Sequence, residues 1–258
     1  MLDGLRLTFG TLTAIPVPAP TRIDRTVAGR AMTLAPVTQL PLAGVLLLWG
    51  WAVREAPVPP LLAAALTLVA VTLATRGMHL DGLADTADGL SASYDHDKAL
   101  DVMRRSDIGP SGVAAVVLVL LVDTAALASL LTSGRGVVLV CVSLVASRHL
   151  LAWACASGVP SARAKGLGAT VAGTVQRGVT ALVFVLLLGV SALACQWSGS
   201  SWWVGAVVLG VAAVGAVAVI HRAILRFGGI TGDVLGAVIE VSFAAALTAS
   251  AVLLSVTR

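Results

Sequence analysis

Residues 76–90 read RGMHLDGLADTADGL and place three carboxylates, Asp81, Asp85 and Asp88, at spacings of four and three. In an α-helix these positions fall on one side, within an arc of about 60°. Only small or apolar residues and one threonine separate the acids, so a ligand could approach them closely. Uncompensated acids on one face are costly unless a cation neutralises them or water surrounds them. The stretch therefore predicts either a solvated acidic face on a surface helix or a cation site.

The composition of the whole chain favours the cation site. The chain has 258 residues, of which 58% are hydrophobic and only 12% are charged, and its mean hydropathy is +0.97. These values are typical of a polytopic membrane protein. Clustered acids at the edge of a bilayer core are usually functional. Oxygen ligands suit Mg²⁺ or Mn²⁺, which commonly binds substrate phosphates as well, so we expect a metal site for phosphate chemistry at the membrane surface.

Seven apolar runs are long enough to span a bilayer, and they predict an all-α, polytopic membrane helix bundle with the lipid bilayer as its main partner. The runs cover 34–53, 59–76, 112–132, 136–157, 178–196, 202–221 and 234–256. No linker divides the chain, so we expect a single integral membrane domain over 1–258. Within it, 1–33 forms an N-terminal cytoplasmic or interfacial segment, whose residues 2–15 could lie on the membrane surface as a short helix. Residues 77–111 form an acidic active-site segment.

The distribution of basic residues predicts the orientation. The loops on one side carry thirteen of the 17 Lys and Arg residues, whereas the other side has only Arg54, Arg135 and Arg258. The basic side faces the cytoplasm under the positive-inside rule, which puts the N-terminus inside. We therefore expect a multi-pass protein of the cell (inner) membrane whose active site faces the cytoplasm. The net charge of +4 is explained by these loops, and no nucleic-acid partner is expected.

A glycine-rich turn precedes the last apolar run. Gly229, Thr231 and Gly232 could hold phosphate through backbone N–H groups at the start of a helix. Asp233 and Glu240 are seven residues apart and share a helix face, which makes both candidate metal ligands. Glu240 lies in an otherwise apolar run, and the alternative is a buried carboxylate paired with Arg148 or His149.

Other polar residues have a functional and a structural interpretation each. Asp107 is either a helix cap or a further metal ligand, and His79 is either a general base or a hydrogen-bonded structural residue. Arg148, inside an apolar run, could reach phosphate or an acid. The remaining candidates for phosphate binding, which could equally be ordinary loop charges, are Arg104, Arg105, Arg163 and Lys165.

Several of these motifs together resemble a known family. HLDGLADTADGL at 79–90 and GGITGDVLGAVIE at 228–240 resemble the signatures of the cobalamin 5′-phosphate synthases, also called adenosylcobinamide-GDP ribazoletransferases. MRRSDIGPSG at 103–112 and VPSARAKGLG at 159–168 are similar to other segments of that family. The run SASYDHDKAL at 91–100 departs from it, because the family version is richer in glycine and contains an arginine.

The resemblance implies a transferase of vitamin B12 nucleotide-loop assembly. It would join adenosylcobinamide-GDP to α-ribazole, or to its 5′-phosphate, and release GMP, with Mg²⁺ as the metal. Asp81, Asp85 and Asp88 would hold that metal, and Asp88 could instead accept a proton from the attacking hydroxyl. The protein partners compatible with this resemblance are a second copy of the chain and other enzymes of the corrinoid pathway.

Two alternatives belong to other classes. A CDP-alcohol phosphotransferase making phospholipid would carry Ala-Arg shortly after the aspartate-glycine pair, but Asp88-Gly89 is followed by LSAS. A transporter would use Arg148 and Glu240 for ion coupling, and it would be expected to show internal repeats or broken helices at mid-membrane depth. The polar, glycine-bearing loops at 79–107, 160–168 and 227–236 instead lie on one side, where we expect them to converge on one site, which favours the enzyme.

Overall fold

The structure is a computed structural model that describes residues 1–56, 58–92, 94–105 and 107–256. Within these residues the regular elements are all helices, which confirms the predicted all-α class. In chain order they are α1 (Leu2–Leu12), α2 (Arg25–Thr33), η1 (Ala35–Gln39), α3 (Leu40–Glu55), α4 (Pro60–Ala74), α5 (Met78–Ala92), α6 (His96–Val102), α7 (Pro110–Leu130), α8 (Gly134–Ala154), α9 (Leu167–Val171), α10 (Arg177–Trp197), α11 (Trp203–Phe227) and α12 (Gly232–Val256).

Six of these elements are long and apolar enough to cross a membrane. They are the continuous stretch Ala35–Glu55, in which η1 leads into α3, and the helices α7, α8, α10, α11 and α12. Their positions match six of the seven predicted runs, so the polytopic membrane bundle is confirmed. The side of the membrane on which the N-terminus lies stays a prediction from the basic residues.

The second predicted run, 59–76, corresponds to α4, which is too short to qualify as a span alone and does so only as a bent pair with α5. α4 has only 15 residues and is followed by α5 at an angle of 90°. The chain turns at Arg76 and Gly77, whose φ angles are +58° and +68°. The Arg76 guanidinium donates to the carbonyl oxygens of Gly10 at 2.8 Å and Thr11 at 3.2 Å. The bend is therefore tied to the C-terminal end of α1, whose free carbonyls attract a cation.

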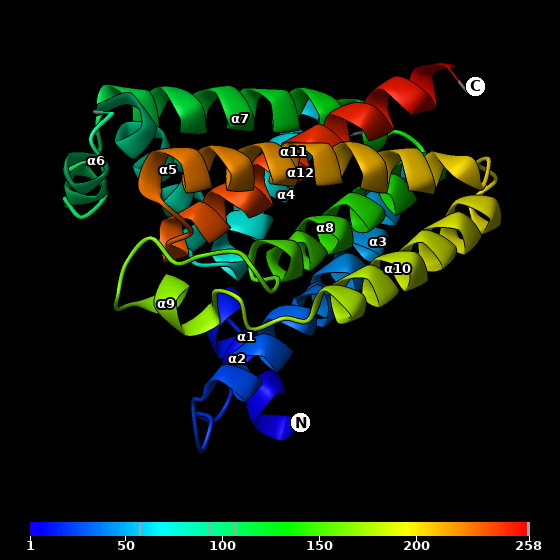
Figure 1. Cartoon of the computed structure of the whole chain (residues 1–258). Helices are drawn as coiled ribbons and strands as arrows, with labels where there is room; N and C mark the ends of the chain where they lie inside the picture. Colours follow the sequence, from blue (N-terminus) through cyan, green and yellow to red (C-terminus); the bar gives the residue numbers. More distant parts are fainter. Residues whose placement is uncertain (57, 93, 106, 257–258) are drawn as a thin grey trace.

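The centre of the bundle is formed by α8 and α12 (Figure 1). α12 packs against α5, α7, α8 and α11. In the most apolar 18-residue stretch of α8, 78% is buried inside the protein. The corresponding value for α10 is only 17%. A helix that buries so little of its apolar surface inside the protein has most of it available to lipid. α10 is thus the most lipid-exposed of the six spanning elements.

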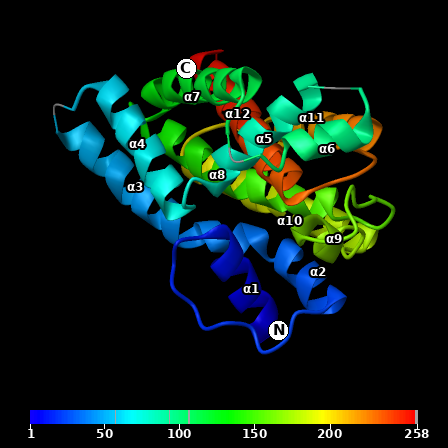
Figure 2. The ribbon, with the colours of Figure 1, turned by 90° about the vertical axis from the view of Figure 1, so that its left-hand side faces the viewer.

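The two N-terminal helices lie beside the bundle rather than in it. α1 and α2 pack against each other, and the loop between them folds back alongside them (Figure 2). The Asp3 carboxylate closes this loop by accepting the backbone N–H of Thr21 at 2.9 Å and its hydroxyl at 2.6 Å. The short helix expected near the N-terminus is confirmed, whereas its position on the membrane surface stays a prediction.

Candidate active site

The acidic stretch forms a helix, as predicted, and its three carboxylates have different surroundings. On α5, Asp81 is exposed, Asp85 is partly buried and Asp88 is buried. α5 packs on both α7 and α12, so it is not the freely solvated surface helix of the simpler interpretation. Its acids are positioned by neighbouring helices, which a ligand site requires.

Two glycines bring α5 and α12 into direct contact. A Cβ atom added to Gly82 would lie 2.7 Å from the carbonyl oxygen of Asp233, and one added to Gly236 would lie 2.9 Å from that of His79. Helix pairs in membranes approach this closely only through small residues. The close crossing therefore places the glycine-bearing turn of 228–236 beside the acidic helix α5. Asp233 lies near the carboxylates of α5 as a result.

The resulting cluster contains more negative than positive charge. Among the described residues, Asp85 is repelled by Asp81, Asp233 and Asp88 and attracted by Arg163. The Arg163 guanidinium lies 3.7 Å from the Asp233 carboxylate and donates to the carbonyl oxygen of Leu100 at 2.9 Å. A second cation would relieve this repulsion.

Arg163 is held in place by pairing between two predicted loops. The N–H of Ala162 donates to the carbonyl oxygen of Ile230 at 3.0 Å, and the N–H of Ile230 donates to that of Pro160 at 2.9 Å. Gly229 faces this pairing, because an added Cβ would lie 2.5 Å from the carbonyl oxygen of Pro160. The three loops expected to meet on one face, 79–107, 160–168 and 227–236, therefore do converge, and Gly229 serves their packing.

The start of α12 is stabilised by the predicted turn. The Thr231 hydroxyl accepts the N–H of Val234 at 3.2 Å and lies 3.1 Å from the Asp233 carboxylate, to which it donates. Thr231 therefore acts as a helix cap and orients Asp233. Gly232 is the first residue of α12. Phosphate binding by Gly229, Thr231 and Gly232 stays a prediction.

Asp88 is the acid with the most complete set of partners. Its carboxylate accepts the N–H of Gly109 at 2.6 Å and the N–H of Gly112 at 2.8 Å, at the start of α7. A Cβ on either glycine would overlap the carboxylate, which accounts for both glycines of the SDIGPSG segment. Because each oxygen already accepts a backbone hydrogen bond, Asp88 is better suited to hold α7 than to take a proton from substrate.

A second polar group lies deeper in the bundle. Glu240 Oε1 is 3.8 Å from His79 Nδ1, and a guanidinium nitrogen of Arg148 is 3.5 Å from the same ring nitrogen. Arg148 and Glu240 also attract each other, so the alternative of a buried carboxylate close to Arg148 matches this arrangement. His149 is elsewhere: it accepts a hydrogen bond from the Trp153 indole and stacks on Phe184. His79, 3% exposed, belongs to this inner group rather than to the exposed acids.

The remaining predicted residues are exposed. Arg104 pairs with Asp101 at 3.5 Å, and Arg105, Asp107 and Lys165 are at the surface. Arg104, Arg105 and Asp107 follow α6, on the segment that joins α5 to α7. They could contact a large substrate, and their roles stay predictions.

The donors of the outer cluster suit a hard divalent cation. Asp81, Asp85 and Asp233 offer only oxygens, and a single arginine balances them. Among the described residues no three acidic, histidine or cysteine side chains are close enough to form a ready-made metal site. Magnesium typically takes one or two carboxylates and completes its shell with water and substrate phosphate, so it does not require a ready-made group of three.

Comparison with known proteins agrees with these motifs. The model of the cobalamin-5-phosphate synthase family matches residues 4–251. An adenosylcobinamide-GDP ribazoletransferase of Nocardioides sp. is 43% identical over 96% of this chain and 98% of the relative, and one of Frankia casuarinae is 41% identical over 96% and 94%. The chain belongs to the cobalamin-5-phosphate synthase family. No solved structure matches it.

Membership of the cobalamin-5-phosphate synthase family confirms the resemblance and disfavours both alternatives. The match runs from α1 to α12, so it includes all three converging loops.

One buried acid was not among the predicted site residues. Asp123 on α7 is 1% exposed, has no hydrogen-bond partner among the described residues and is repelled by Glu240. A lone aspartate within the apolar run 112–132 was the signal that could have revealed it.

Proposed function

We propose that this chain is an adenosylcobinamide-GDP ribazoletransferase. It would join adenosylcobinamide-GDP to α-ribazole, or to its 5′-phosphate, and release GMP. The observation that supports the proposal is the meeting of Asp81, Asp85, Asp233 and Arg163, drawn from three distant segments, in a chain that matches its relatives over nearly its whole length.

The reaction forms a phosphate ester bond and breaks the phosphoanhydride bond of the diphosphate. A hydroxyl of the ribazole ribose attacks the phosphorus nearest cobinamide, its proton leaves, and the P–O bond to GMP breaks. Asp81, Asp85 and Asp233 would hold Mg²⁺, which when bound neutralises negative charge on the diphosphate. The sequence also suggested Asp107 and Glu240 as metal ligands. We leave them out of this set, because Asp107 is exposed after α6 and Glu240 lies in the inner group with His79 and Arg148.

The residues of the chain contribute position and charge. Arg163 is fixed by Leu100 and Asp233, and its guanidinium suits the oxygens of the diphosphate. Asp88 holds the start of α7 beside the acids. The positive-inside rule supports an active site that faces the cytoplasm, where soluble corrinoid and ribazole substrates would arrive.

A turnover assay tests this proposal. Purified protein in nanodiscs receives adenosylcobinamide-GDP and α-ribazole with Mg²⁺ or with EDTA, and GMP and corrinoid product are measured. We expect metal-dependent turnover that Asp81→Asn abolishes. Turnover that survives both EDTA and Asp81→Asn would refute the metal site, and no turnover by folded wild type would refute the proposed reaction.

A further inference from the structure

A cavity away from the candidate active site carries two arginines. It measures about 580 Å³ and lies between α2 and the segment that leads from α9 into α10. Arg25, Arg30, Thr174 and Gln176 are among its lining residues, and none of the described residues that line it is acidic. The nearest acid in sequence, Asp24, is engaged elsewhere: it accepts the N–H of Val27 at 2.8 Å and pairs with Arg22 at 3.4 Å.

This cavity has firm walls. A Cβ added to Gly29 would lie 2.6 Å from the carbonyl oxygen of Thr174, so α2 rests directly on the 172–175 segment. Arg25 donates to the carbonyl oxygen of Ala172 at 2.9 Å. Arg30 forms no ion pair within the part of the chain that the structure describes. Both guanidinium groups keep free donors, which favours an anion such as a phosphate group.

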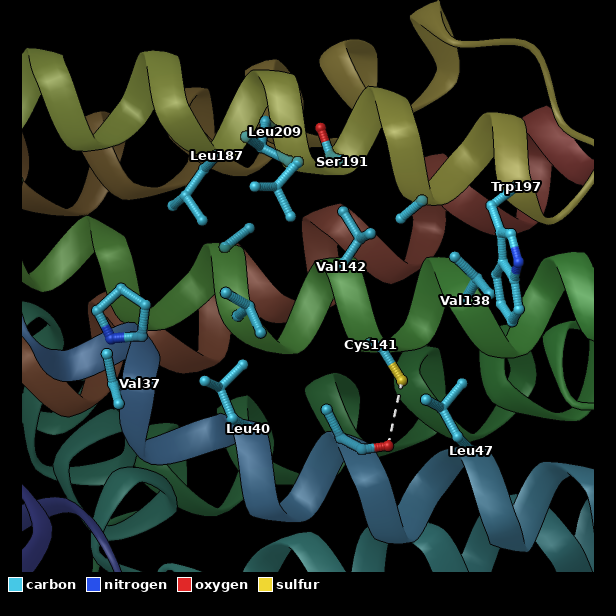
Figure 3. A pocket seen from close by; sticks show the side chains of 16 residues that line it. Val37, Leu40, Leu47, Val138, Cys141, Val142, Leu187, Ser191, Trp197 and Leu209 are labelled. Carbon is cyan, nitrogen blue, oxygen red and sulfur yellow. Dashed lines mark hydrogen bonds between the residues drawn. The ribbon is translucent and has the colours of Figure 1, made fainter.

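A second, mostly apolar groove lies between α3 and α10, with α8 as its floor (Figure 3). It measures about 430 Å³. Figure 3 shows Leu40 and Leu47 on α3, Val138, Cys141 and Val142 on α8, and Leu187, Ser191 and Trp197 on α10. From Leu187 to Trp197 the helix rises about 15 Å, which is the depth of one leaflet of the hydrocarbon core.

The two hollows are linked along the chain on two sides, although no described residue lines both. On one side the chain passes from Leu34, which lines the polar cavity, to Pro36 and Val37, which line the groove. On the other side one face of α10 lines both. That face carries Gln176 and Val179 in the polar cavity, Val183 in between, and Leu187, Val190 and Ala194 in the groove. The spacings of three and four keep these positions on one side of the helix.

We propose that the two hollows together bind one anionic phospholipid. Its phosphate lies between Arg25 and Arg30, and one acyl chain follows the face of α10 into the groove. Two arginines without an acidic partner among the described residues match the charge of such an amphiphile. From Val179 in the polar cavity to Leu187 in the groove α10 rises about 12 Å, so an acyl chain that crosses one leaflet of about 15 Å reaches the groove. Neither end contains a residue of the acidic cluster, so this site is separate from the proposed reaction.

Native mass spectrometry of delipidated protein in detergent tests the proposal. The protein receives equal amounts of phosphatidylglycerol and phosphatidylcholine. We expect one retained phosphatidylglycerol, preferred about 25-fold, because each of the two arginines near an anionic headgroup contributes roughly a fivefold gain in affinity. Arg25→Gln/Arg30→Gln should remove this preference, whereas Arg22→Gln should keep it. Each single variant should give an intermediate preference, which keeps the test valid if the double variant fails to fold.

Substitutions that fill the groove test whether a lipid or another molecule occupies it. Ala194→Leu should fill the groove and lower retention of both lipids, while Ala181→Leu, on another face of α10, should behave as wild type. Equal retention of the two lipids by wild type, or retention unchanged in Arg25→Gln/Arg30→Gln, would overturn the proposal. So would displacement of the lipid by inorganic phosphate without any effect of Ala194→Leu, which would indicate a free-anion site. A lipid-free dimer would show that a second copy covers the groove.

Discussion

The Asp88 carboxylate accepts the backbone N–H of Gly112 at 2.8 Å and joins the acidic helix α5 to the first turn of α7. It also accepts the N–H of Gly109, so one side chain satisfies two of the free donors at this helix start. We expect Asp88→Ala to lower the free energy of unfolding by about 2–4 kcal/mol, since hydrogen bonds to a charged group contribute about 1.5–3 kcal/mol each. Thermal unfolding in detergent measures this.

Asp97→Ala is the matched control for Asp88→Ala, because Asp97 is exposed on α6. It should unfold as wild type does. Asp88→Asn should fall between wild type and Asp88→Ala, since its amide keeps one acceptor oxygen. If Asp88→Ala unfolded like wild type and yet lost turnover, Asp88 would be a reacting group rather than a positioning residue.

The crossing of α5 and α12 should tolerate no added methyl group. Gly82→Ala places a Cβ 2.7 Å from the carbonyl oxygen of Asp233, which must shift the backbone that carries this acid. We expect turnover to fall at least tenfold and stability to fall by about 1–3 kcal/mol. Gly44→Ala and Gly210→Ala are suitable controls, because an added Cβ meets nothing within 4 Å at either position. Equal effects at all three glycines would contradict a specific role for the crossing.

The charge imbalance around Asp85 predicts opposite effects on stability and turnover. Asp85→Asn removes a carboxylate that Asp81, Asp233 and Asp88 repel. Without metal it should unfold at the same temperature as wild type or higher, and its turnover should fall at least a hundredfold. Mg²⁺ should raise the unfolding temperature of wild type but not that of Asp85→Asn. A variant that is still stabilised by Mg²⁺ would place the metal elsewhere.

The sequence predicted the membrane bundle and the convergence of three loops well, for physical reasons. Spans of about 20 apolar residues and the one-sided Lys and Arg distribution are strong signals. The boundary predicted between 76 and 77 falls at the bend, but the 90° angle between α4 and α5 was not predicted, because only Gly77 marks it in the sequence. The role of Asp88 was also missed. A side chain that caps a helix start 21 residues later leaves no periodic pattern in the sequence.

Arg163 should be needed for binding of the diphosphate substrate. Its guanidinium contacts both Leu100 and Asp233, so its position is fixed before substrate arrives. We expect Arg163→Gln to raise the KM for adenosylcobinamide-GDP about tenfold or more, and Arg163→Lys to recover only part of this loss because lysine lacks the planar fork. Lys165→Gln, at an exposed position two residues away, should change KM less than twofold. Equal effects of the two glutamine variants would indicate general loop charge.

The inner group of Glu240, His79 and Arg148 should contribute mainly to stability. Arg148 is 1% exposed and is attracted by Glu240, with His79 within 4 Å of both, although no direct Arg148–Glu240 ion pair lies within 4 Å in the described part of the chain. Removing one of two buried opposite charges leaves the other uncompensated, which costs up to about 3–5 kcal/mol. Glu240→Ala should therefore unfold at a much lower temperature, and adding Arg148→Leu should recover part of the loss. A double-mutant cycle of unfolding temperatures measures this coupling. If Glu240→Ala kept its stability and lost its response to Mg²⁺, Glu240 would instead be a metal ligand, as its spacing from Asp233 first suggested.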